Sequence, residues 1–217
     1  MISVVIPTFN AQDHLARCFD CLIGATVRGL VREVIVADGG SSDETLAIAD
    51  AAGAHVVSAP KGRGAQFAAG ARAARGDWLL FLHPETALEA GWEAEAESFM
   101  TRTTLERPRA AAFRFASDDF GASARRAEMA AALRCSLFGL PYGNQGLLLP
   151  KRLYQKLGGH RAGALEDIDL VRRIGRRRLV MLRSRAVNKI EPRENRTALM
   201  ILHALRVPAA LVAHFAR

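Results

Sequence analysis

The first half of the chain alternates short apolar, β-branched runs with alanine-rich stretches that have helical periodicity. The apolar runs predict strands over residues 2–7, 33–37, 55–59 and 78–82. The stretches between them predict helices over residues 13–25, 43–52 and 64–74, the second of them capped by Ser42. This order predicts an α/β fold with a Rossmann-like, mostly parallel central sheet and helices on both faces.

The second half of the chain is less regular. It predicts helices over residues 92–100, 125–138, 151–157 and 167–175, and strands over 111–115 and 146–149. No repeat or clear linker divides the sequence, so we expect a single domain over residues 1–217. The stretch 198–215 is apolar but contains Arg206 and Pro208. It therefore favours a helix that packs on the domain or lies on a membrane surface over one that spans a bilayer.

The charge of the chain points to an anionic partner. The formal net charge is +8, which suits a phosphate-bearing substrate, a lipid surface or nucleic acid. Aromatic residues make up only 6% of the chain, and no RNA-binding signature is present. We therefore expect no nucleic-acid partner.

The cysteines and the N-terminus bear on the compartment. Cys18, Cys21 and Cys135 are an odd number of cysteines, which is typical of a reducing compartment rather than a disulfide framework. Cys18 and Cys21 form a C-x-x-C pattern inside a predicted helix without a second pair, which favours structural thiols over a zinc or redox site. The apolar N-terminal run lacks a basic flank and is interrupted by Pro7, unlike a signal peptide. We expect a cytoplasmic protein.

Two loops that follow predicted strands carry candidate nucleotide contacts. Ligands of doubly wound sheets bind outside the carboxyl ends of the strands, so the loops after the four predicted strands should share one crevice. In the first loop, Thr8 and Asn10 can hydrogen-bond a base or a ribose. In the second, Asp38 is followed by Gly39 and Gly40, which let the backbone approach a ligand closely. A cap at Asp38 with turn-forming glycines explains the same residues.

The next two loops offer cations and a possible metal ligand. Lys61 and Arg63 suit a diphosphate, although the chain has neither a P-loop nor a dinucleotide fingerprint. His83 and Glu85 lie two residues apart in an extended segment and point to the same side, where a metal could bind. A plain turn at the end of a strand also accounts for this pair.

A third candidate site begins the last predicted helix. Glu166, Asp167 and Asp169 are placed favourably for the helix dipole, which is one explanation for them. They also follow the glycine-rich segment 158–163, which could form a flap over a substrate. A general base needs a carboxylate within hydrogen-bond reach of an acceptor hydroxyl, and Asp167 is the natural candidate.

Taken in order, these segments resemble the family 2 glycosyltransferases, which have the GT-A fold. The resemblance rests on residues 4–10 (VVIPTFN), residues 33–45 (EVIVADGGSSDET) and the pair Glu166-Asp167. Residues 62–66 (GRGAQ), 76–83 (GDWLLFLH) and 143–146 (GNQG) are similar to a bacterial subgroup of short enzymes, often named radical-SAM or selenodomain-associated transferases. Each motif is weak alone, but their order and spacing cover nearly the whole chain.

The resemblance implies a role for each candidate residue. A nucleotide sugar would bind the half formed by about residues 1–86, through Pro7, Thr8, Asn10, Asp38, Gly39, Lys61, Arg63 and His83. Glu85 takes the final position of the family's D-x-D motif and would bind a divalent metal, Mn²⁺ or Mg²⁺. Catalysis would fall to Asp167 with its neighbour Glu166. The acceptor would bind the half formed by about residues 87–217, which ends in a helical segment, on the side of Gly143, Asn144, Gln145 and Gly146.

These roles imply an inverting glycosyltransferase in which Asp167 deprotonates an acceptor hydroxyl. A UDP-sugar is the favoured donor. The acceptor is unidentified; one expectation is a lipid-linked acceptor reached through a peripheral contact at the inner face of the membrane. Two alternatives stay open, a noncatalytic nucleotide-sugar-binding protein and a sugar-1-phosphate nucleotidyltransferase. The sequence pattern of the latter enzymes has a glycine-rich basic loop directly after the first strand. This chain has PTFN there, which argues against that alternative.

Overall fold

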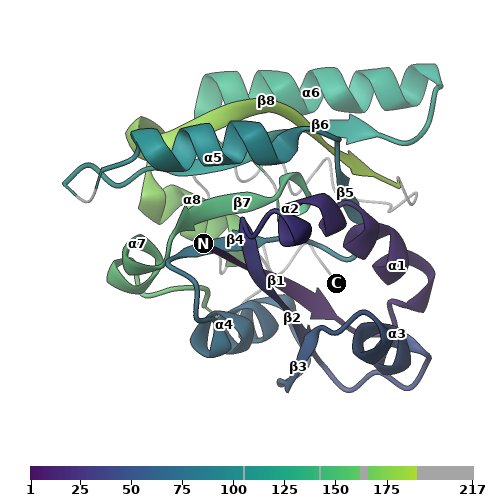
Figure 1. Ribbon diagram of the computed structural model, residues 1–217. Coiled ribbons are helices and arrows are strands. Elements are labelled where there is room, and N and C mark those ends of the chain that lie inside the picture. Colours follow the sequence, from purple (N-terminus) through teal and green to yellow (C-terminus); the bar gives the residue numbers. More distant parts are fainter. Residues whose placement is uncertain (105, 142, 162–165, 190–217) are drawn as a thin grey trace, which may run out of the picture.

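The computed structural model describes residues 1–104, 106–141, 143–161 and 166–189, which form an eight-stranded sheet with helices on both faces (Figure 1). The strands are β1 (Ile2–Thr8), β2 (Val31–Asp38), β3 (His55–Ser58), β4 (Trp78–Phe81), β5 (Thr86–Leu88), β6 (Ala110–Ser117), β7 (Leu147–Pro150) and β8 (Leu179–Asn188). The α-helices are α1 (Gln12–Asp20), α2 (Ile23–Val27), α3 (Thr45–Ala51), α4 (Arg63–Ala73), α5 (Trp92–Arg102), α6 (Ala122–Phe138), α7 (Lys151–Lys156) and α8 (Glu166–Ile174). Two 3-10 helices are η1 (Gly143–Gln145) and η2 (Arg176–Arg178).

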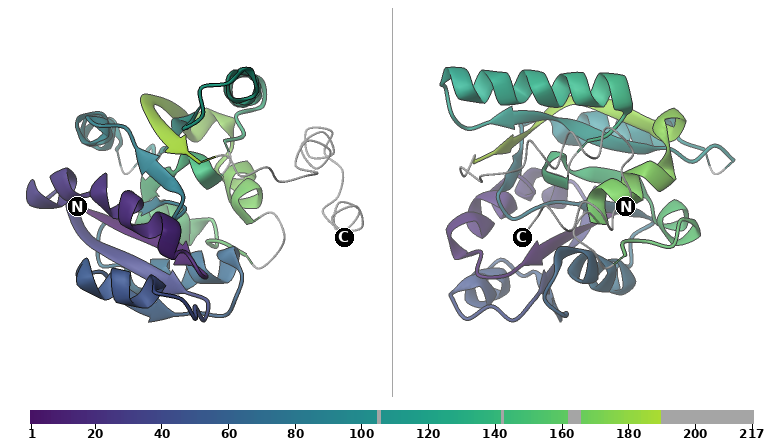
Figure 2. Two further views of the ribbon diagram at one scale, coloured as in Figure 1. Left: turned by 90° about the vertical axis from the view of Figure 1, so that its right-hand side faces the viewer. Right: turned by 180° about the vertical axis from the view of Figure 1, so that it is seen from behind.

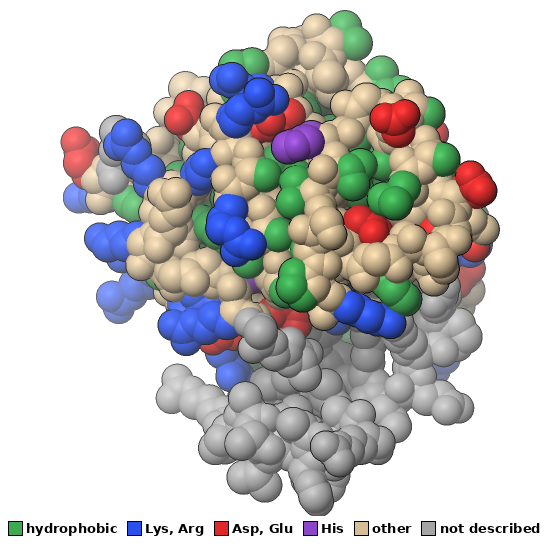
Figure 3. Space-filling model, turned by 90° about the horizontal axis from the view of Figure 1, so that it is seen from below, with side chains coloured by type: hydrophobic (Ala, Val, Ile, Leu, Met, Phe, Trp, Pro, Cys, Tyr) green, Lys and Arg blue, Asp and Glu red, His purple; other side chains and the backbone are tan. Residues whose placement is uncertain are grey.

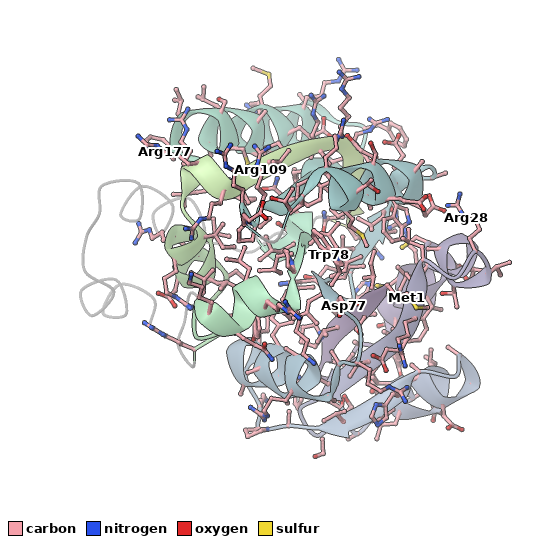
Figure 4. The ribbon with its side chains drawn as sticks, turned by 60° about the vertical axis from the view of Figure 1, so that its left-hand side comes forward. Met1, Arg28, Asp77, Trp78, Arg109 and Arg177 are labelled. Carbon is pink, nitrogen blue, oxygen red and sulfur yellow. The ribbon has the colours of Figure 1, made fainter. Side chains whose placement is uncertain are left out.

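The strand order in the sheet is β3-β2-β1-β4-β7-β6-β8-β5. β1 is parallel to β2 and β4, and β2 is parallel to β3, so these four strands end at one edge. At the opposite edge, Met1 lies beside Trp78, whose backbone N–H donates to the Met1 carbonyl (Figure 4). β7 is antiparallel to β4 and β6, β5 is antiparallel to β8, and β6 is parallel to β8. Four of these seven pairings are parallel, which confirms the predicted mostly parallel sheet.

Each face of the sheet is covered by its own hydrophobic core, because the side chains of a strand alternate between faces. Val4 and Ile6 of β1 pack in one core with residues of α1, α2, α3 and α5. Val5 packs in the other with residues of α4, α7 and α8. Two further views show the helices on either side of the sheet (Figure 2). β1 is buried along its whole length, so its carboxyl end is fixed at the centre of the sheet.

α6 is attached to the domain differently. It lies over β6 at the outer edge of the molecule (Figures 1 and 2). Its buried residues are the small ones, Ala124, Ala131 and Cys135. Neither of the two cores contains a residue of α6, as far as the structure describes them.

Two of the predicted helices differ from the structure. The helix predicted over 13–25 is interrupted at Cys21 and forms α1 and α2. The prediction of Ser42 as the cap of α3 is wrong, because this helix begins at Thr45. The backbone N–H of Ser42 instead donates to Oδ1 of Asn10, at 2.9 Å, and Oδ1 of Asp43 accepts the hydroxyl of Thr45, at 2.5 Å. Ser42 is therefore tied to the first loop, and the local contact at the start of α3 comes from Asp43.

The sequence pattern does not predict β5 or β8. β8 carries the exposed Arg183 and Arg185, and its backbone is held by a residue far away in the chain, since the Glu95 carboxylate accepts the N–H groups of Arg183 and Ser184 at 2.8 Å. Such a partner leaves no local signal. The segment predicted over 198–215 lies outside the described residues. Among the helices that are described, none is long and apolar enough to cross a membrane.

The three cysteines are free, as the prediction of structural thiols requires. Cys18 and Cys135 are buried, whereas Cys21 is half-buried. Burial raises the pKa of Cys18 well above its usual range and the pKa of Cys21 to about 11. Neutral thiols of this kind are poor nucleophiles and metal ligands.

Candidate functional site

The loop after β2 is folded around the carboxylate of Asp38, which is 4% exposed. Its Oδ2 accepts the backbone N–H groups of Gly40 and Ser41 at 2.8 Å. Its Oδ1 accepts the hydroxyls of Thr8, at 2.9 Å, and Ser41, at 2.5 Å. Burial favours the neutral acid, but the hydrogen bonds from Ser41, Gly40 and Thr8 outweigh it and lower the pKa of Asp38. Asp38 thus fixes the ends of β1 and β2, where Pro7 pairs with Ala37, relative to each other.

A buried glutamine ties the same two strand ends to α4. Nε2 of Gln66 donates to the carbonyls of Thr8, at 2.5 Å, and Ala37, at 3.1 Å. A Cβ atom at Gly39 would lie 3.0 Å from this Nε2, so a larger residue there would press on the Gln66 amide. Sequence reasoning did not assign Gln66 a role. Its only signal is its place at the end of the GRGAQ segment.

The rim of these loops presents groups that a ligand can reach from solvent. Phe9, Asn10 and Lys61 are exposed, and Nζ of Lys61 lies 3.6 Å from the centre of the Phe9 ring. Asn10 has a φ of 50°, a left-handed conformation that asparagine tolerates better than most residues. Its backbone N–H donates to Oγ of Ser41 at 2.9 Å. The first two loops therefore hold each other in place before any ligand arrives.

The start of α4 meets the start of α8. Nε of Arg63 lies 3.1 Å from Oε1 of Glu166, whose side chain is 4% exposed. A Cβ atom at Gly64 would lie 2.4 Å from the carbonyl oxygen of Arg161, so the backbone of Arg161 packs directly against α4. The structure therefore brings together Arg63 and Glu166, which the sequence analysis placed in separate candidate sites. The Glu166 carboxylate is paired with the arginine.

The end of β4 meets the start of α8 through a buried histidine. His83 is 2% exposed, and its Nδ1 lies 3.4 Å from Oε1 of Glu85. Its Nε2 lies 3.5 Å from Oδ2 of Asp167. This second contact is loose, because among the described residues Nε2 has no partner with hydrogen-bond geometry. His83 nevertheless places the candidate metal ligand and the candidate base on either side of one imidazole ring.

A second histidine holds the other oxygen of Asp167. Nε2 of His160 lies 3.5 Å from Oδ1 of Asp167, and Nδ1 of His160 lies 3.2 Å from the Tyr154 hydroxyl. The same hydroxyl accepts the backbone N–H of His160 at 2.9 Å. The imidazole stacks on Phe67 with 4.7 Å between ring centres and meets Phe81 edge-on. His160 is therefore rigidly placed. Sequence reasoning missed it, because it stood only as one residue of a glycine-rich segment.

These contacts set the charge of the site. Burial favours a neutral His83, but Asp167 and Glu85 outweigh burial and raise its pKa to about 9. Burial also favours neutral carboxyl groups. The contact with His83 nevertheless lowers the pKa of Glu85 to about 2, and the contacts with His160 and His83 lower that of Asp167 far below its usual range. Asp167 is therefore ionised at neutral pH.

Glu85 is the candidate metal ligand. Its side chain is 32% exposed, so its carboxylate reaches both His83 and the solvent. In the described part of the chain, no group of three or more His, Cys, Asp or Glu side chains is arranged to hold a metal ion by itself. Divalent ions bound together with phosphates commonly take only one or two protein carboxylates. Glu85 fits such a shared site.

The predicted acceptor side surrounds η1. Gln145 is 1% exposed; its Nε2 donates to the Phe113 carbonyl at 2.9 Å, and its Oε1 accepts from Arg134 of α6 at 3.0 Å. The Asn144 carbonyl accepts from Nδ2 of Asn188 at 2.8 Å. The side-chain Oδ1 of Asn144 is buried and has no hydrogen-bond partner among the described residues. Gln145 is thus committed to the fold, whereas Asn144 retains an unused acceptor atom.

A small hollow brings the acceptor side next to the base. It is lined by Phe67, Phe81, Pro141, Gly146, Leu147, His160, Asp167 and Val171. Gly146 has a φ of +65°, and a Cβ atom there would lie 3.0 Å from Leu82 and Phe113. Residues predicted for the donor, the metal, the base and the acceptor therefore meet where β1, β2 and β4 end.

Part of the chain is similar to known glycosyltransferases. Residues 3–92 match the family model described as glycosyl transferase family 2. The glucosyl-3-phosphoglycerate synthase of Mycolicibacterium paratuberculosis is 39% identical over 90 residues, 37% of this chain and 27% of that protein. A PGL/p-HBAD biosynthesis glycosyltransferase of Mycobacterium bovis is 33% identical over 108 residues, 46% of this chain and 41% of that protein. The matched part thus spans less than half of each of these curated relatives.

The fold is similar to that of a solved structure along nearly the whole chain. Glucosyl-3-phosphoglycerate synthase from Mycobacterium tuberculosis, solved with Mn²⁺, UDP-glucose and phosphoglyceric acid, superimposes with a TM-score of 0.70. It is 21% identical, and the match covers 96% of this chain and 80% of that one. The predicted fold is confirmed, because the chain has the GT-A fold. The predicted family agrees with the match of residues 3–92 to the glycosyl transferase family 2 model, which covers less than half of the chain.

Proposed function

We propose that the protein is an inverting glycosyltransferase that moves a sugar from a UDP-sugar to an acceptor hydroxyl. The observation that carries this proposal is the ionised Asp167, held between His83 and His160 beside Glu85. A general base needs a carboxylate that can reach the acceptor hydroxyl, and Asp167 lines a hollow next to the strand ends where nucleotides bind. The family match of residues 3–92, and the UDP-glucose in the solved relative, support the donor.

The donor would bind across the four strand-end loops. Phe9, Asn10 and Lys61 are exposed at the rim and would contact the base, the ribose and the diphosphate. Thr8 and Asp38 would act by holding the loop, because their side chains already bond each other. Pro7, Gly39 and His83 shape the same surface.

Arg63 and Glu166 would act as a pair. The arginine side chain is 40% exposed and can turn toward the diphosphate, whereas the carboxylate is buried against it. Glu166 is therefore proposed as a positioning residue for Arg63 rather than as a group that touches substrate. An ion bound by Glu85 and the diphosphate would neutralise charge on the departing UDP.

Asp167 would take the proton of the acceptor hydroxyl as the hydroxyl oxygen forms its bond to the anomeric carbon. The bond from that carbon to the diphosphate oxygen breaks on the opposite face, so the configuration inverts and UDP leaves. The acceptor would lie along η1, where Gly146 borders Asp167 and Asn144 has an unpaired Oδ1. Phosphoglyceric acid, present in the solved relative, is one acceptor to test, and a lipid-linked hydroxyl is another.

The test is UDP release from UDP-glucose by the purified chain, with Mn²⁺ and with or without each acceptor. Transfer of the sugar to water in place of an acceptor would release glucose, and proton NMR of the first glucose formed then reports the stereochemistry without a known acceptor. We expect Mn²⁺-dependent release and β-glucose from the α-linked donor. α-Glucose as the first product would contradict inversion. UDP binding without any release would favour the noncatalytic alternative. Release of pyrophosphate from UTP and glucose 1-phosphate would favour the nucleotidyltransferase.

A further inference from the structure

α6 places its large apolar side chains on the outside. Met129, Leu133 and Leu137 repeat every four residues along the helix and are 71%, 60% and 54% exposed. Phe120, just before the helix, is 98% exposed. Residues four apart lie on one face of a helix, so these side chains form a continuous apolar stripe. We call Met129, Leu133 and Leu137 the α6 stripe.

In the described part of the chain, the inner face of α6 carries no large apolar side chains that are buried against the domain. It contacts β6 through small residues, Ala124, Ala131 and Cys135, and adds nothing to the two described cores. A helix that only covers a domain carries its large apolar residues inward and polar residues outward. A contiguous exposed apolar surface on a folded domain commonly marks an interaction site.

Both ends of the α6 stripe are flanked by arginine. Arg125 and Arg126 are exposed in the first two turns of α6. At the other end Arg176, Arg177 and Arg178 of η2 are exposed, and Arg176 donates to the carbonyls of Ser136 and Leu137. Figure 4 labels Arg177 beside this end of the helix. By contrast, the face formed by α3 and α4 carries acidic and basic side chains together (Figure 3).

Acidic groups near the stripe are few and mostly engaged. The Glu128 carboxylate is half-buried and accepts the backbone N–H of Ser117 at 2.9 Å. Asp118 pairs with Arg17 at 2.7 Å. Asp119 is exposed next to Phe120. The surface around the stripe is therefore apolar along its middle and cationic at both ends.

We propose that the α6 stripe, with Phe120 and the flanking arginines, docks on the surface of an anionic lipid bilayer. Apolar side chains that enter the headgroup boundary and arginines that meet anionic lipids are the two contributions to interfacial helix binding. A convex helix at the outer edge of the domain suits a flat bilayer. A second copy would bring ten arginine side chains of like charge together, and nucleic acid offers nothing to the apolar stripe.

The docking surface adjoins the acceptor side. Arg134 of α6 donates to Gln145 of η1, and Cys135 contacts the same side chain. A bilayer bound at the outer face of α6 would therefore lie one helix away from η1. The docking inference does not depend on the proposed transferase chemistry, and its test needs no turnover.

The experiment is vesicle sedimentation of the full chain. Vesicles of phosphatidylcholine alone are compared with vesicles that also contain phosphatidylglycerol, at low and at physiological salt. We expect binding to the anionic vesicles that weakens with salt. The triple variant Met129→Ser, Leu133→Ser, Leu137→Ser and the double variant Arg125→Gln, Arg126→Gln should each lower the partition coefficient about tenfold or more.

Matched controls change exposed residues elsewhere. The variant Ile23→Ser, Val27→Ser on α2 and the variant Arg32→Gln should bind like the unchanged chain, because these side chains are equally exposed but lie outside the stripe. Leu133→Trp adds a reporter whose emission should shift to the blue on anionic vesicles, with the same variant in buffer as the reference.

Four results would overturn the inference. One is the absence of binding to anionic vesicles, and a second is binding that the triple variant leaves unchanged. A third is self-association in analytical ultracentrifugation that the triple variant abolishes, which would make a second copy the partner. Oligonucleotide binding that needs Arg125 and Arg126 but not the α6 stripe would assign the arginines to nucleic acid instead.

Discussion

The strand-end loops of the first half and α6 in the second half use their side chains in opposite ways. In the loops, polar groups such as Asp38, Thr8 and Gln66 are buried and bonded to one another. On α6, large apolar groups such as Met129 and Leu133 face the solvent. The loops are organised before a ligand binds, which favours precise chemistry. The helix leaves its contact surface exposed, which favours a partner that supplies the missing apolar environment.

The largest expected effect is on turnover, through the base. Asp167→Asn keeps the shape of the side chain but cannot accept the acceptor proton, so UDP release should fall by roughly a hundred- to ten-thousand-fold. UDP affinity, measured by calorimetry, should change by less than about threefold, because the first-half loops bind the nucleotide independently of Asp167. An unchanged rate would show that another group is the base.

The next largest effect is on stability, when the Asp38 hydrogen bonds that hold the loop after β2 are removed. Asp38→Ala removes the acceptor of four hydrogen bonds and should lower the free energy of unfolding by about 2 kcal/mol. Urea denaturation measures this loss. Asp50→Ala, an exposed carboxylate on α3, is the matched control and should have little effect. Equal losses for both variants would mean that the Asp38 network does not organise the loop.

His160→Phe tests how the second half places the base. The phenyl ring can keep the packing on Phe67 and Phe81 but loses the contacts with Asp167 and Tyr154. We expect kcat to fall about tenfold, in line with the loss of other groups that orient a reactive residue, with KM for the donor nearly unchanged. His160→Gln should recover part of the rate. A fall in stability without this split between kcat and KM would indicate a purely structural role.

The smallest expected effect is on stability, through Glu33 of β2, which is hydrogen-bonded to Ser3 of β1. The Glu33 carboxylate accepts the Ser3 hydroxyl and the backbone N–H of Arg75, at 2.6 Å each. Burial raises the pKa of Glu33, but these hydrogen bonds outweigh burial and lower it. Its contribution is therefore present above the unfolded pKa of about 4.3 and is lost as the pH falls through the folded value. Glu33→Gln should cost about 1 kcal/mol at neutral pH. Urea denaturation should show this difference shrinking in acid; a constant difference would contradict the assignment.

The same contrast explains how far the sequence predicted the structure. The first four strands and the loops around Asp38 and Glu85 follow from local periodicity and from segments that resemble one family. His160, Tyr154 and Gln66 could not be predicted, because their partners Asp167 and Thr8 are brought to them only by the packing of α4, α7 and α8. β8 was missed because Glu95, far away in the chain, holds its backbone. The role of α6 requires knowing which of its faces is buried.

We propose that the first-half loops and Glu85 form a metal-dependent nucleotide site. Calorimetric titration of the purified chain with UDP, with and without Mn²⁺, tests it most directly, with Glu85→Ala in parallel. We expect UDP binding that Mn²⁺ strengthens about tenfold or more, and a Glu85→Ala variant in which this enhancement is lost. An absence of UDP binding in the presence of Mn²⁺, or equal enhancement in the variant, would contradict it.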